Sequence, residues 1–256
     1  MTAEPALLEL TGVSKRFGRI TVADQLSLRF AAGEMVGIVG PNGAGKSTLF
    51  AMIAGDVRPD AGTVVLGGSA LNRLDPAGRC KLGIARTYQV PRPFENMTVF
   101  ENLLVAAFAG GGLSRGQGYE VAAQILEQTG LAPNANTPAG RLGLLQRKRL
   151  ELARGLATRP RVLLLDEVAG GLTDPEVGEL VGLINEVQSQ PVEWARQQGL
   201  TIVWVEHVVH ALIRAVSRLL CLADGRLIAE GAPQEVLDNP EVKQVYLGAD
   251  FRAPHA

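Results

Sequence analysis

Short apolar runs open the chain and predict strands. Leu7–Val13 and Thr21–Phe30 alternate partly between apolar and polar positions, which is typical of strands with one buried face. Met35–Val39 is mostly apolar and bounded by glycine, so we expect a central strand buried on both faces. This third run leads directly into a glycine-rich segment.

Helical patterns replace the strand patterns between about Pro91 and Arg159. Helices are expected at Thr98–Ala109, Tyr119–Gly130 and Gln146–Leu156, with a break at Gly110–Gly112. The pattern indicates a helical subdomain, at about residues 90–160, inserted into a different kind of structure.

Strands and helices alternate again after Pro160. Strands are expected at Val162–Asp166 and Thr201–Val205, each followed by a helix, and the first of these helices is broken at Ser189–Pro191. Arg218–Gly231 predicts a hairpin, because an Asp-Gly turn separates two apolar runs. The whole pattern predicts an α/β fold with an N-terminal antiparallel β subdomain and an inserted helical subdomain.

Composition narrows the class of protein. The 256 residues are 46% hydrophobic, enough for a substantial core, and the net charge of −1 gives no overall field that would attract nucleic acid. The apolar runs are far shorter than the roughly 18 residues that span a bilayer. Residues 1–10 lack the pattern of a secretory signal, so we expect a cytoplasmic protein.

The segment Gly40–Ser47 matches the phosphate-binding pattern G-x-x-x-x-G-K-[ST] between an expected strand and an expected helix. In such a loop, backbone N–H groups surround phosphate oxygens, the lysine reaches the outer phosphates, and the serine ligates Mg²⁺. The predicted nucleotide-binding residues are Gly40, Pro41, Asn42, Gly43, Ala44, Gly45, Lys46, Ser47 and Thr48.

Two adjacent acids end the apolar run at 162–166. A phosphate loop needs a carboxylate to help hold Mg²⁺, and Asp166 is the candidate, together with Ser47. Glu167 is then expected to polarise the water that attacks the γ-phosphate. Without the phosphate loop, both acids would be read as solvated turn residues.

With these motifs in order, the chain resembles the nucleotide-binding subunits of ABC transporters over nearly its whole length. The resemblance implies a P-loop NTPase core of the ABC ATPase fold, a single domain over residues 1–256, and ATP with Mg²⁺ as ligands. It also implies that Phe17 stacks on adenine, that Gln89 senses Mg²⁺ and the membrane subunit, and that His207 contacts the γ-phosphate.

Longer phrases, such as RTYQVPRPFENMTVFENLLVA and EGAPQEVLDNPEVKQVYLG, are similar to the branched-chain, or hydrophobic, amino acid uptake group of importers. That likeness implies two ATPase subunits, two membrane permeases and an external solute-binding protein. The chain would lie on the inner face of the membrane. Related importers carry urea, amides or other small solutes, so the resemblance does not identify the solute that is transported.

The family's signature loop, LSGGQ, is altered here. The aligned residues are Leu142, Gly143, Leu144, Leu145 and Gln146, so a serine hydroxyl and two glycines are missing. We therefore hypothesise pairing with a different ATPase subunit that has a full signature. Three cations follow at 147–149, and we expect a solvated helix face there rather than a nucleic-acid patch.

The D-loop position is also changed, because Thr173 stands where the family has Asp or Asn, and Asp174 comes next. Either residue could fill the role of the D-loop residue.

Two rival functions remain at this stage: a nucleotide-binding subunit with weak hydrolysis in an asymmetric pair, and a soluble ABC ATPase that acts on DNA or ribosomes. The single cassette and the lack of a heptad run disfavour the second rival.

Overall fold

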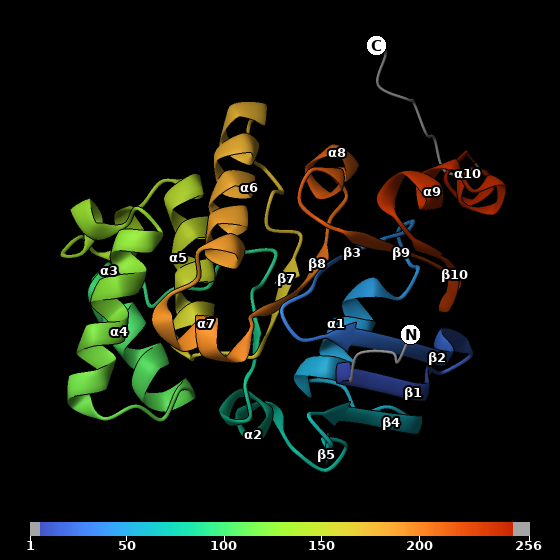
Figure 1. The fold of residues 1–256 in the computed structure, drawn as a ribbon, viewed down its shortest axis with the longest axis horizontal. Coiled ribbons are helices and arrows are strands. Elements are labelled where there is room, and N and C mark those ends of the chain that lie inside the picture. Colours follow the sequence, from blue (N-terminus) through green and yellow to red (C-terminus); the bar gives the residue numbers. More distant parts are fainter. Residues whose placement is uncertain (1–5, 248–256) are drawn as a thin grey trace.

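The computed structural model describes residues 6–247, which form two sheets and a block of helices (Figure 1). The strands are β1 (Ala6–Phe17), β2 (Ile20–Ala31), β3 (Met35–Val39), β4 (Ala61–Leu66), β5 (Ser69–Ala70), β6 (Ile84–Arg86), β7 (Val162–Asp166), β8 (Thr201–Val205), β9 (Arg218–Ala223) and β10 (Arg226–Gly231). The α-helices are α1 (Lys46–Ala54), α2 (Pro76–Lys81), α3 (Val99–Val105), α4 (Arg115–Gln128), α5 (Leu144–Ala157), α6 (Asp174–Ser189), α7 (Glu193–Gln198), α8 (Val209–Ile213), α9 (Pro233–Asp238) and α10 (Pro240–Leu247).

The larger sheet has the order β10-β9-β3-β8-β7-β6, and all its pairs are parallel except the β9–β10 hairpin. Every residue of β3, β7 and β8 is buried, as expected for strands covered on both faces. Because parallel strands end at the same edge, the loops after these three strands meet there, and ligands of α/β sheets bind at such an edge.

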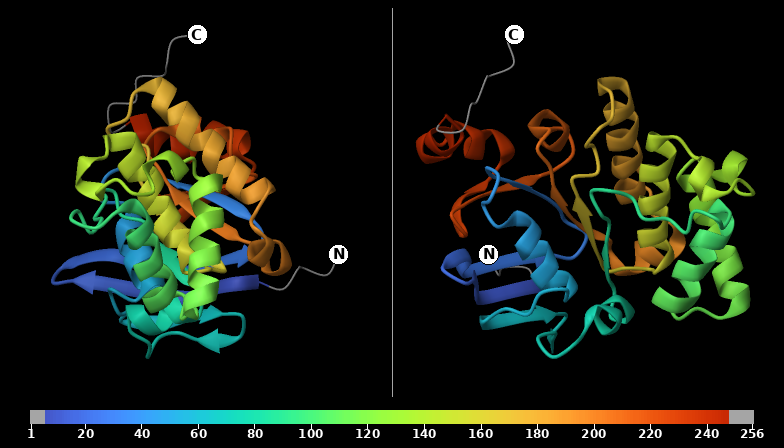
Figure 2. Two further views of the ribbon diagram at one scale, coloured as in Figure 1. Left: turned by 90° about the vertical axis from the view of Figure 1, so that its left-hand side faces the viewer. Right: turned by 180° about the vertical axis from the view of Figure 1, so that it is seen from behind.

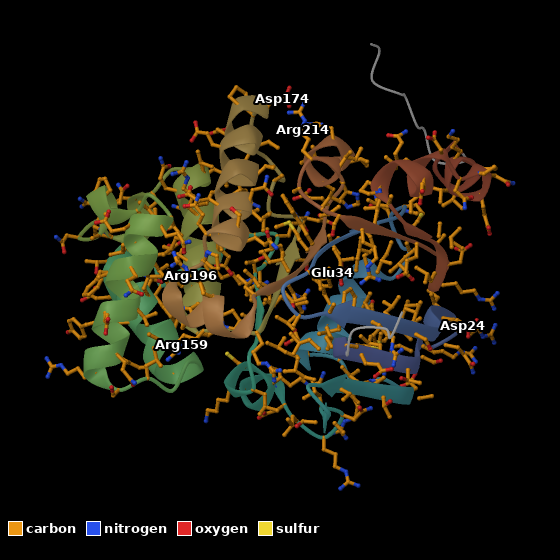
Figure 3. The ribbon with its side chains drawn as sticks, viewed as in Figure 1. Asp24, Glu34, Arg159, Asp174, Arg196 and Arg214 are labelled. Carbon is orange, nitrogen blue, oxygen red and sulfur yellow. The ribbon has the colours of Figure 1, made fainter. Side chains whose placement is uncertain are left out.

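The smaller sheet is antiparallel, with the order β2-β1-β4-β5. Helix α1 lies between the two sheets, and its Phe50 and Ile53 share one buried cluster with Phe30 of β2 and Ile38 of β3. An ion pair joins the sheets, because Arg226 Nη2 of β10 lies 2.6 Å from Asp24 Oδ2 of β2. Arg218 of β9 pairs at 2.6 Å with Glu34, in the turn between β2 and β3, and also donates to a carbonyl oxygen of β2 at 2.7 Å; Figure 3 labels both acids. The antiparallel subdomain is therefore fixed to the core by packing and charge.

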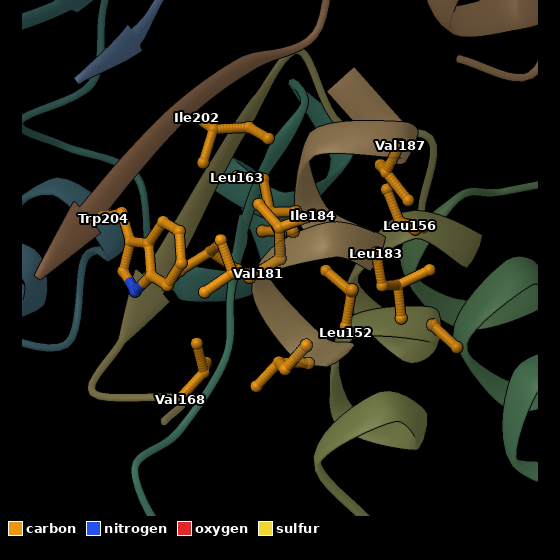
Figure 4. Packing of buried hydrophobic residues seen from close by; sticks show 14 of the residues in the cluster. Leu152, Leu156, Leu163, Val168, Val181, Leu183, Ile184, Val187, Ile202 and Trp204 are labelled. Carbon is orange, nitrogen blue, oxygen red and sulfur yellow. The ribbon is translucent and has the colours of Figure 1, made fainter. Parts of the chain in front are cut away.

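Helices α3, α4 and α5 stand on the opposite side of the core sheet from the antiparallel sheet (Figure 2). A second buried cluster runs from these helices to the sheet. In Figure 4, Leu152 and Leu156 of α5 lie near Ile184 and Val187 of α6, which in turn covers Leu163 of β7 and the indole of Trp204 of β8. One continuous core thus connects the helical block to the strands that carry the site.

The predicted architecture is confirmed, with differences in detail. The hairpin turn at Asp224–Gly225 has positive φ at both residues, 47° and 73°, as the Asp-Gly pair predicts. The expected helix at Thr98–Ala109 ends as α-helix at Val105 and continues as a π-helical turn over Ala106–Gly110. The break before Pro191 is present, and α7 follows it.

Several elements were not predicted. β5 and β6 have two and three residues, too short for a periodic pattern to register, and β4 adds a further strand to the antiparallel sheet. Within residues 6–247, none of the helices has the length and apolar character needed to cross a membrane.

Candidate nucleotide and catalytic site

The phosphate loop connects β3 to α1 and is pressed against neighbouring strands. Gly40 and Gly45 have φ of 151° and 96°, values that side chains rarely adopt. A Cβ at Gly40 would lie 2.1 Å from the Leu222 carbonyl oxygen, and one at Gly45 would lie 2.2 Å from the Val22 carbonyl oxygen. Both positions therefore require glycine for packing, before any ligand is considered.

Lys46 is the first residue of α1 and is only 5% exposed. Its Nζ donates to the carbonyl oxygens of Gly40 at 2.7 Å and Pro41 at 3.0 Å, so the ammonium group folds back over the loop. Burial lowers the pKa of Lys46, while the nearby carboxylates of Glu167 and Asp166 oppose that shift. A cation is thus held at the loop by two carbonyl oxygens, in a position to bind an anion.

Glu167 and His207 face each other from the loops after β7 and β8. His207 Nε2 lies 2.7 Å from Glu167 Oε1. The backbone of Glu167 is left-handed, with φ of 48°, and its N–H donates to the Val205 carbonyl at 2.9 Å. Such a backbone is uncommon for a residue with a side chain and is often found at functional sites.

A cavity of about 190 Å³ brings these groups together. It is lined by residues 42–48 of the loop and α1, by Val22 of β2, and by Glu167 and His207. The structure therefore places the phosphate loop, a carboxylate and a histidine around one space, although the two side chains come from positions about 120 and 160 residues after the loop.

Asp166 ends β7, is 5% exposed, and is not among the residues that line this cavity. Its Oδ2 accepts a hydrogen bond from Arg86 Nη2 at 2.8 Å, and Arg86 also donates to Asp56 Oδ2 at 2.9 Å. Ser47 lines the cavity itself. A hydroxyl and a carboxylate are oxygen donors of the kind that Mg²⁺ takes when substrate phosphates and water complete its shell, so these residues fit the ion.

Other predicted site residues lie apart from the cavity. Phe17 ends β1, is 51% exposed, and has Lys15 Nζ 5.3 Å from its ring centroid. Gln89 is exposed in the loop after β6, and its carbonyl oxygen accepts from Lys148 Nζ. Neither side chain lines the 190 Å³ cavity.

The two D-loop candidates lie at the start of α6 (Figure 3). The backbone N–H and Oγ1 of Thr173 both donate to the Glu176 carboxylate, at 2.9 Å and 2.8 Å, and these bonds lower the pKa of Glu176. The Thr173 hydroxyl is therefore used within its own helix. Asp174 is exposed, so it is the freer of the two to meet another molecule.

The altered signature residues form the N-terminus of α5. Gly143 is the N-cap residue, with φ of −66° and ψ of 171°, and supplies no side-chain cap. Leu144 is 44% exposed, whereas Leu145 is 8% exposed and belongs to the core. Gln146 Oε1 lies 2.9 Å from the position of a Cβ on Gly143, so this side chain turns back over the loop.

The expected solvated face at residues 147–149 is wrong for its central member. Lys148 is 2% exposed and bonds to two loop carbonyls. Arg147 donates to the Leu142 and Gly140 carbonyls and lies 4.0 Å from the exposed carboxylate of Glu95, and Arg149 pairs with the surface acid Glu179 at 2.8 Å. The sequence shows that these residues are charged, but it does not show that α5 turns the side carrying Lys148 towards the core.

Four residues of the site region were missed by sequence reasoning: Val22, Arg86, Lys148 and Glu206. Val22 belongs to a strand whose pattern gives no sign of the cavity. Arg86 gave no signal either, because β6, the three-residue strand that it ends, is too short for a periodic pattern to register. Lys148 and Glu206 became visible only through their burial.

Comparison with known proteins agrees with this geometry. Residues 23–170 match the family model described as ABC transporter, and residues 226–252 match the model described as Branched-chain amino acid ATP-binding cassette transporter. The chain is 34% identical to the high-affinity branched-chain amino acid transport ATP-binding protein BraF of Pseudomonas aeruginosa, over 94% of this chain and 98% of that one. It is also 35% identical to the lipopolysaccharide export system ATP-binding protein LptB of Acidithiobacillus ferridurans, over 96% and 98%.

Solved structures show the same likeness. The ADP conformation of an ATP-binding cassette of an ABC transporter superposes with a TM-score of 0.82 at 29% identity, over 95% of this chain and 99% of that one. A dimeric ATP-binding cassette in a post-hydrolysis state, bound to ADP and Pi, gives a TM-score of 0.74 at 26% identity, over 88% and 98%.

The fold and the site define a P-loop ATPase of the cassette type. This chain belongs to the ABC transporter family, as an ATP-binding subunit. Its relatives include the ATP-binding proteins of branched-chain amino acid importers.

Proposed function

We propose that the chain hydrolyses ATP to drive a membrane importer of branched-chain or related hydrophobic amino acids, or of other small solutes. The contact of 2.7 Å between Glu167 and His207, beside the phosphate loop, carries the hydrolytic part of this proposal. The match of residues 226–252 favours amino-acid import over lipopolysaccharide export as the transported class.

In this mechanism, the loop N–H groups and Lys46 hold the β- and γ-phosphates of ATP. Glu167 accepts a proton from the attacking water, and His207 keeps the carboxylate oriented and contacts the γ-phosphate. When bound, Mg²⁺ would offset phosphate charge; Ser47, Asp166 and Gln89 are the residues proposed to hold it. Phe17 is proposed to stack on adenine.

The proposed partners are a second ATPase subunit, two permeases and, through the permeases, an external solute-binding protein. The chain would then be cytoplasmic and bound to the inner face of the membrane. A second cavity of about 290 Å³ supports a permease-binding site near Gln89. This cavity lies between α3, α5 and the core and is bordered by Tyr88 and Phe94 after β6. Exposed apolar side chains beside Gln89 suit a protein contact.

A substitution at Val90 tests the proposed permease-binding site, because this side chain is 69% exposed next to Gln89. We expect Val90→Asp to weaken permease binding by about thirtyfold, the loss typical of a charge or truncation at an interface hot spot. ATP hydrolysis by the isolated chain should persist. Copurification of permeases with tagged chain measures the effect, and Ile213→Asp, an exposed apolar position on α8, is the matched control. If the two variants recover equal amounts of permease, the permease binds to another surface of the chain.

Uptake of labelled solutes in cells lacking this chain tests the function as a whole. We expect leucine, isoleucine or valine uptake to fall to background, and to return with the unaltered chain but not with Lys46→Ala. Competition by unlabelled urea and amides distinguishes the related solutes. If leucine uptake is unchanged while uptake of one of those solutes is lost, the chain drives an importer, but the assignment of amino acids as its solutes is wrong.

One observation favours a second candidate, an asymmetric ATPase pair. Gly143 offers no hydroxyl, and Leu144 exposes an apolar side chain at the helix end where the signature contacts the partner's ATP. A site that uses this signature would hydrolyse slowly, whereas the site built from Lys46 and Glu167 would be competent with a full signature opposite. An isolated chain that dimerises with ATP and turns over as fast as a mixed complex would refute the asymmetry.

A further inference from the structure

Two charged side chains beside the catalytic site are buried and have no part in the proposed chemistry. Lys148 of α5 and Glu206, which follows β8, are each 2% exposed. A buried charge is costly unless hydrogen bonds or an opposite charge stabilise it. Such groups are therefore expected to have specific hydrogen-bonding or ionic partners, and these partners indicate what each group does.

Lys148 connects three segments. Its Nζ donates to the carbonyl oxygen of Gln89 at 2.6 Å, in the loop after β6, and lies 3.4 Å from the carbonyl oxygen of Glu167, in the loop after β7. The lysine itself stands one turn into α5, the helix that begins with the signature residues. A single cation thus bridges the signature helix, the loop of Gln89 and the loop of the catalytic carboxylate.

Glu206 makes the complementary connection. Its Oε1 accepts from the backbone N–H of Ala169 at 2.6 Å, and its Oε2 accepts from the backbone N–H of His207 at 3.2 Å. Ala169 lies two residues after Glu167, and His207 carries the imidazole that contacts Glu167. Glu206 therefore ties the loop after β7 to the loop after β8.

The negative charge of Glu206 acts on Lys148. Burial lowers the pKa of Lys148, and the negative charges of Glu206, Glu151 and Glu167 oppose that shift. Burial likewise raises the pKa of Glu206, while the N–H groups that it accepts from oppose the shift. Glu206 thus favours the charged form of Lys148, and the two side chains form a frame that contacts the loops after β6, β7 and β8.

The frame surrounds a backbone that needs support. Glu167 holds a left-handed φ of 48°, its N–H bonds to Val205, its carbonyl oxygen lies near Lys148, and its side chain contacts His207. Uncommon backbone conformations of this kind persist only where the surroundings fix them. Figure 4 shows Val168, the next residue, near Trp204 of β8 and Val181 of α6, so packing fixes the loop from another side.

We propose that Lys148 and Glu206 are positioning residues that hold the Gln89 loop, the Glu167 loop and the His207 loop in one arrangement, with Lys148 extending that arrangement to the signature helix. This inference rests on the proposed role of Glu167 as the base. Removing either charge should misplace the carboxylate relative to the phosphate while leaving the phosphate loop intact.

The test compares Lys148→Met and Glu206→Gln with Arg149→Met in the full-length chain. Methionine keeps an unbranched stem without the charge, and glutamine keeps the shape of Glu206. Arg149→Met removes a cation from the same turn of α5, but Arg149 bonds to Glu179 on the surface instead of to the loops. Three quantities are measured: ATP affinity, ATP turnover, and backbone hydrogen exchange.

In Lys148→Met, amides of residues 87–92 and 166–171 should exchange about tenfold faster or more, as expected when one hydrogen bond to a charged group is lost. Turnover should fall by up to about a hundredfold, the penalty of a small misplacement at a catalytic group, with ATP affinity within about threefold. Glu206→Gln should speed exchange at 166–171 and at His207, but not at 87–92. Arg149→Met should change none of these quantities.

Unchanged exchange in both loops, for both variants, would overturn the proposal. So would faster exchange throughout the chain, including residues 150–157 of α5, because that result would assign Lys148 and Glu206 to general stability. The exchange measurement needs no turnover. A wild-type chain that never hydrolyses ATP would therefore count against the role of Glu167, while the exchange data would still decide whether the loops are held by these two residues.

Discussion

Replacing Glu167 with glutamine should leave ATP bound and nearly stop its hydrolysis. Glutamine keeps the size of the side chain and can still accept from His207, but it cannot take a proton from water. General bases typically contribute a factor of about 10² to 10⁴ in rate, so turnover should fall by that range while the dissociation constant of ATP changes by less than about threefold. Phosphate release and equilibrium nucleotide binding, measured across protein concentrations, give the two quantities.

The control for this experiment is Glu179→Gln, the same chemical change on α6. Glu179 is paired with Arg149 at 2.8 Å, and its side chain is 57% exposed, outside the cavity. It should hydrolyse ATP at the rate of the unaltered chain. Near-normal turnover in Glu167→Gln would remove Glu167 from the role of base, whereas loss of both binding and turnover would indicate a damaged phosphate loop.

The concentration dependence separates two further situations. If specific activity rises with protein concentration and vanishes in Glu167→Gln, the chain is a self-sufficient homodimeric ATPase. If the unaltered chain binds ATP tightly but turns over negligibly at every concentration, it requires a different subunit, and the altered signature loop is the structural reason.

The sequence predicted those parts of the site that depend on local spacing. The phosphate loop is one continuous segment, so the run from Gly40 to Thr48 was identified with its strand and helix in place. Asp166 and Glu167 could be read as a pair because a buried apolar strand precedes them. The Asp-Gly hairpin followed from the φ values that its two turn residues tolerate.

What could not be predicted depends on contacts between distant segments. Lys148 was expected on a solvated face, because a run of three cations on a helix usually is solvated, yet the packing of α5 against the loops after β6 and β7 buries it. The pairing of Arg86 with Asp166 spans 80 residues. Burial and long-range pairing decide the roles of such charges, and neither leaves a periodic pattern in the chain.

Restoring one hydroxyl to the signature loop should strengthen ATP-dependent pairing of two copies of this chain. Gly143 has φ of −66° and ψ of 171°, a conformation that serine adopts readily at a helix N-cap. A Cβ there would meet only Gln146 Oε1, the end of a flexible side chain, so Gly143→Ser fits with a small rotation. Leu145 is a worse target, because it is buried and its truncation would leave a cavity.

The regained bond from serine to a phosphate contributes about 1.5 to 3 kcal/mol, which corresponds to association about tenfold to a hundredfold tighter. Sedimentation with MgATP in a Glu167→Gln background measures association without turnover, and Gly143→Ala, which adds the Cβ without the hydroxyl, is the control. If serine and alanine variants associate equally, the missing hydroxyl does not limit closure, and the exposed Leu144 becomes the feature that directs this chain towards a different partner.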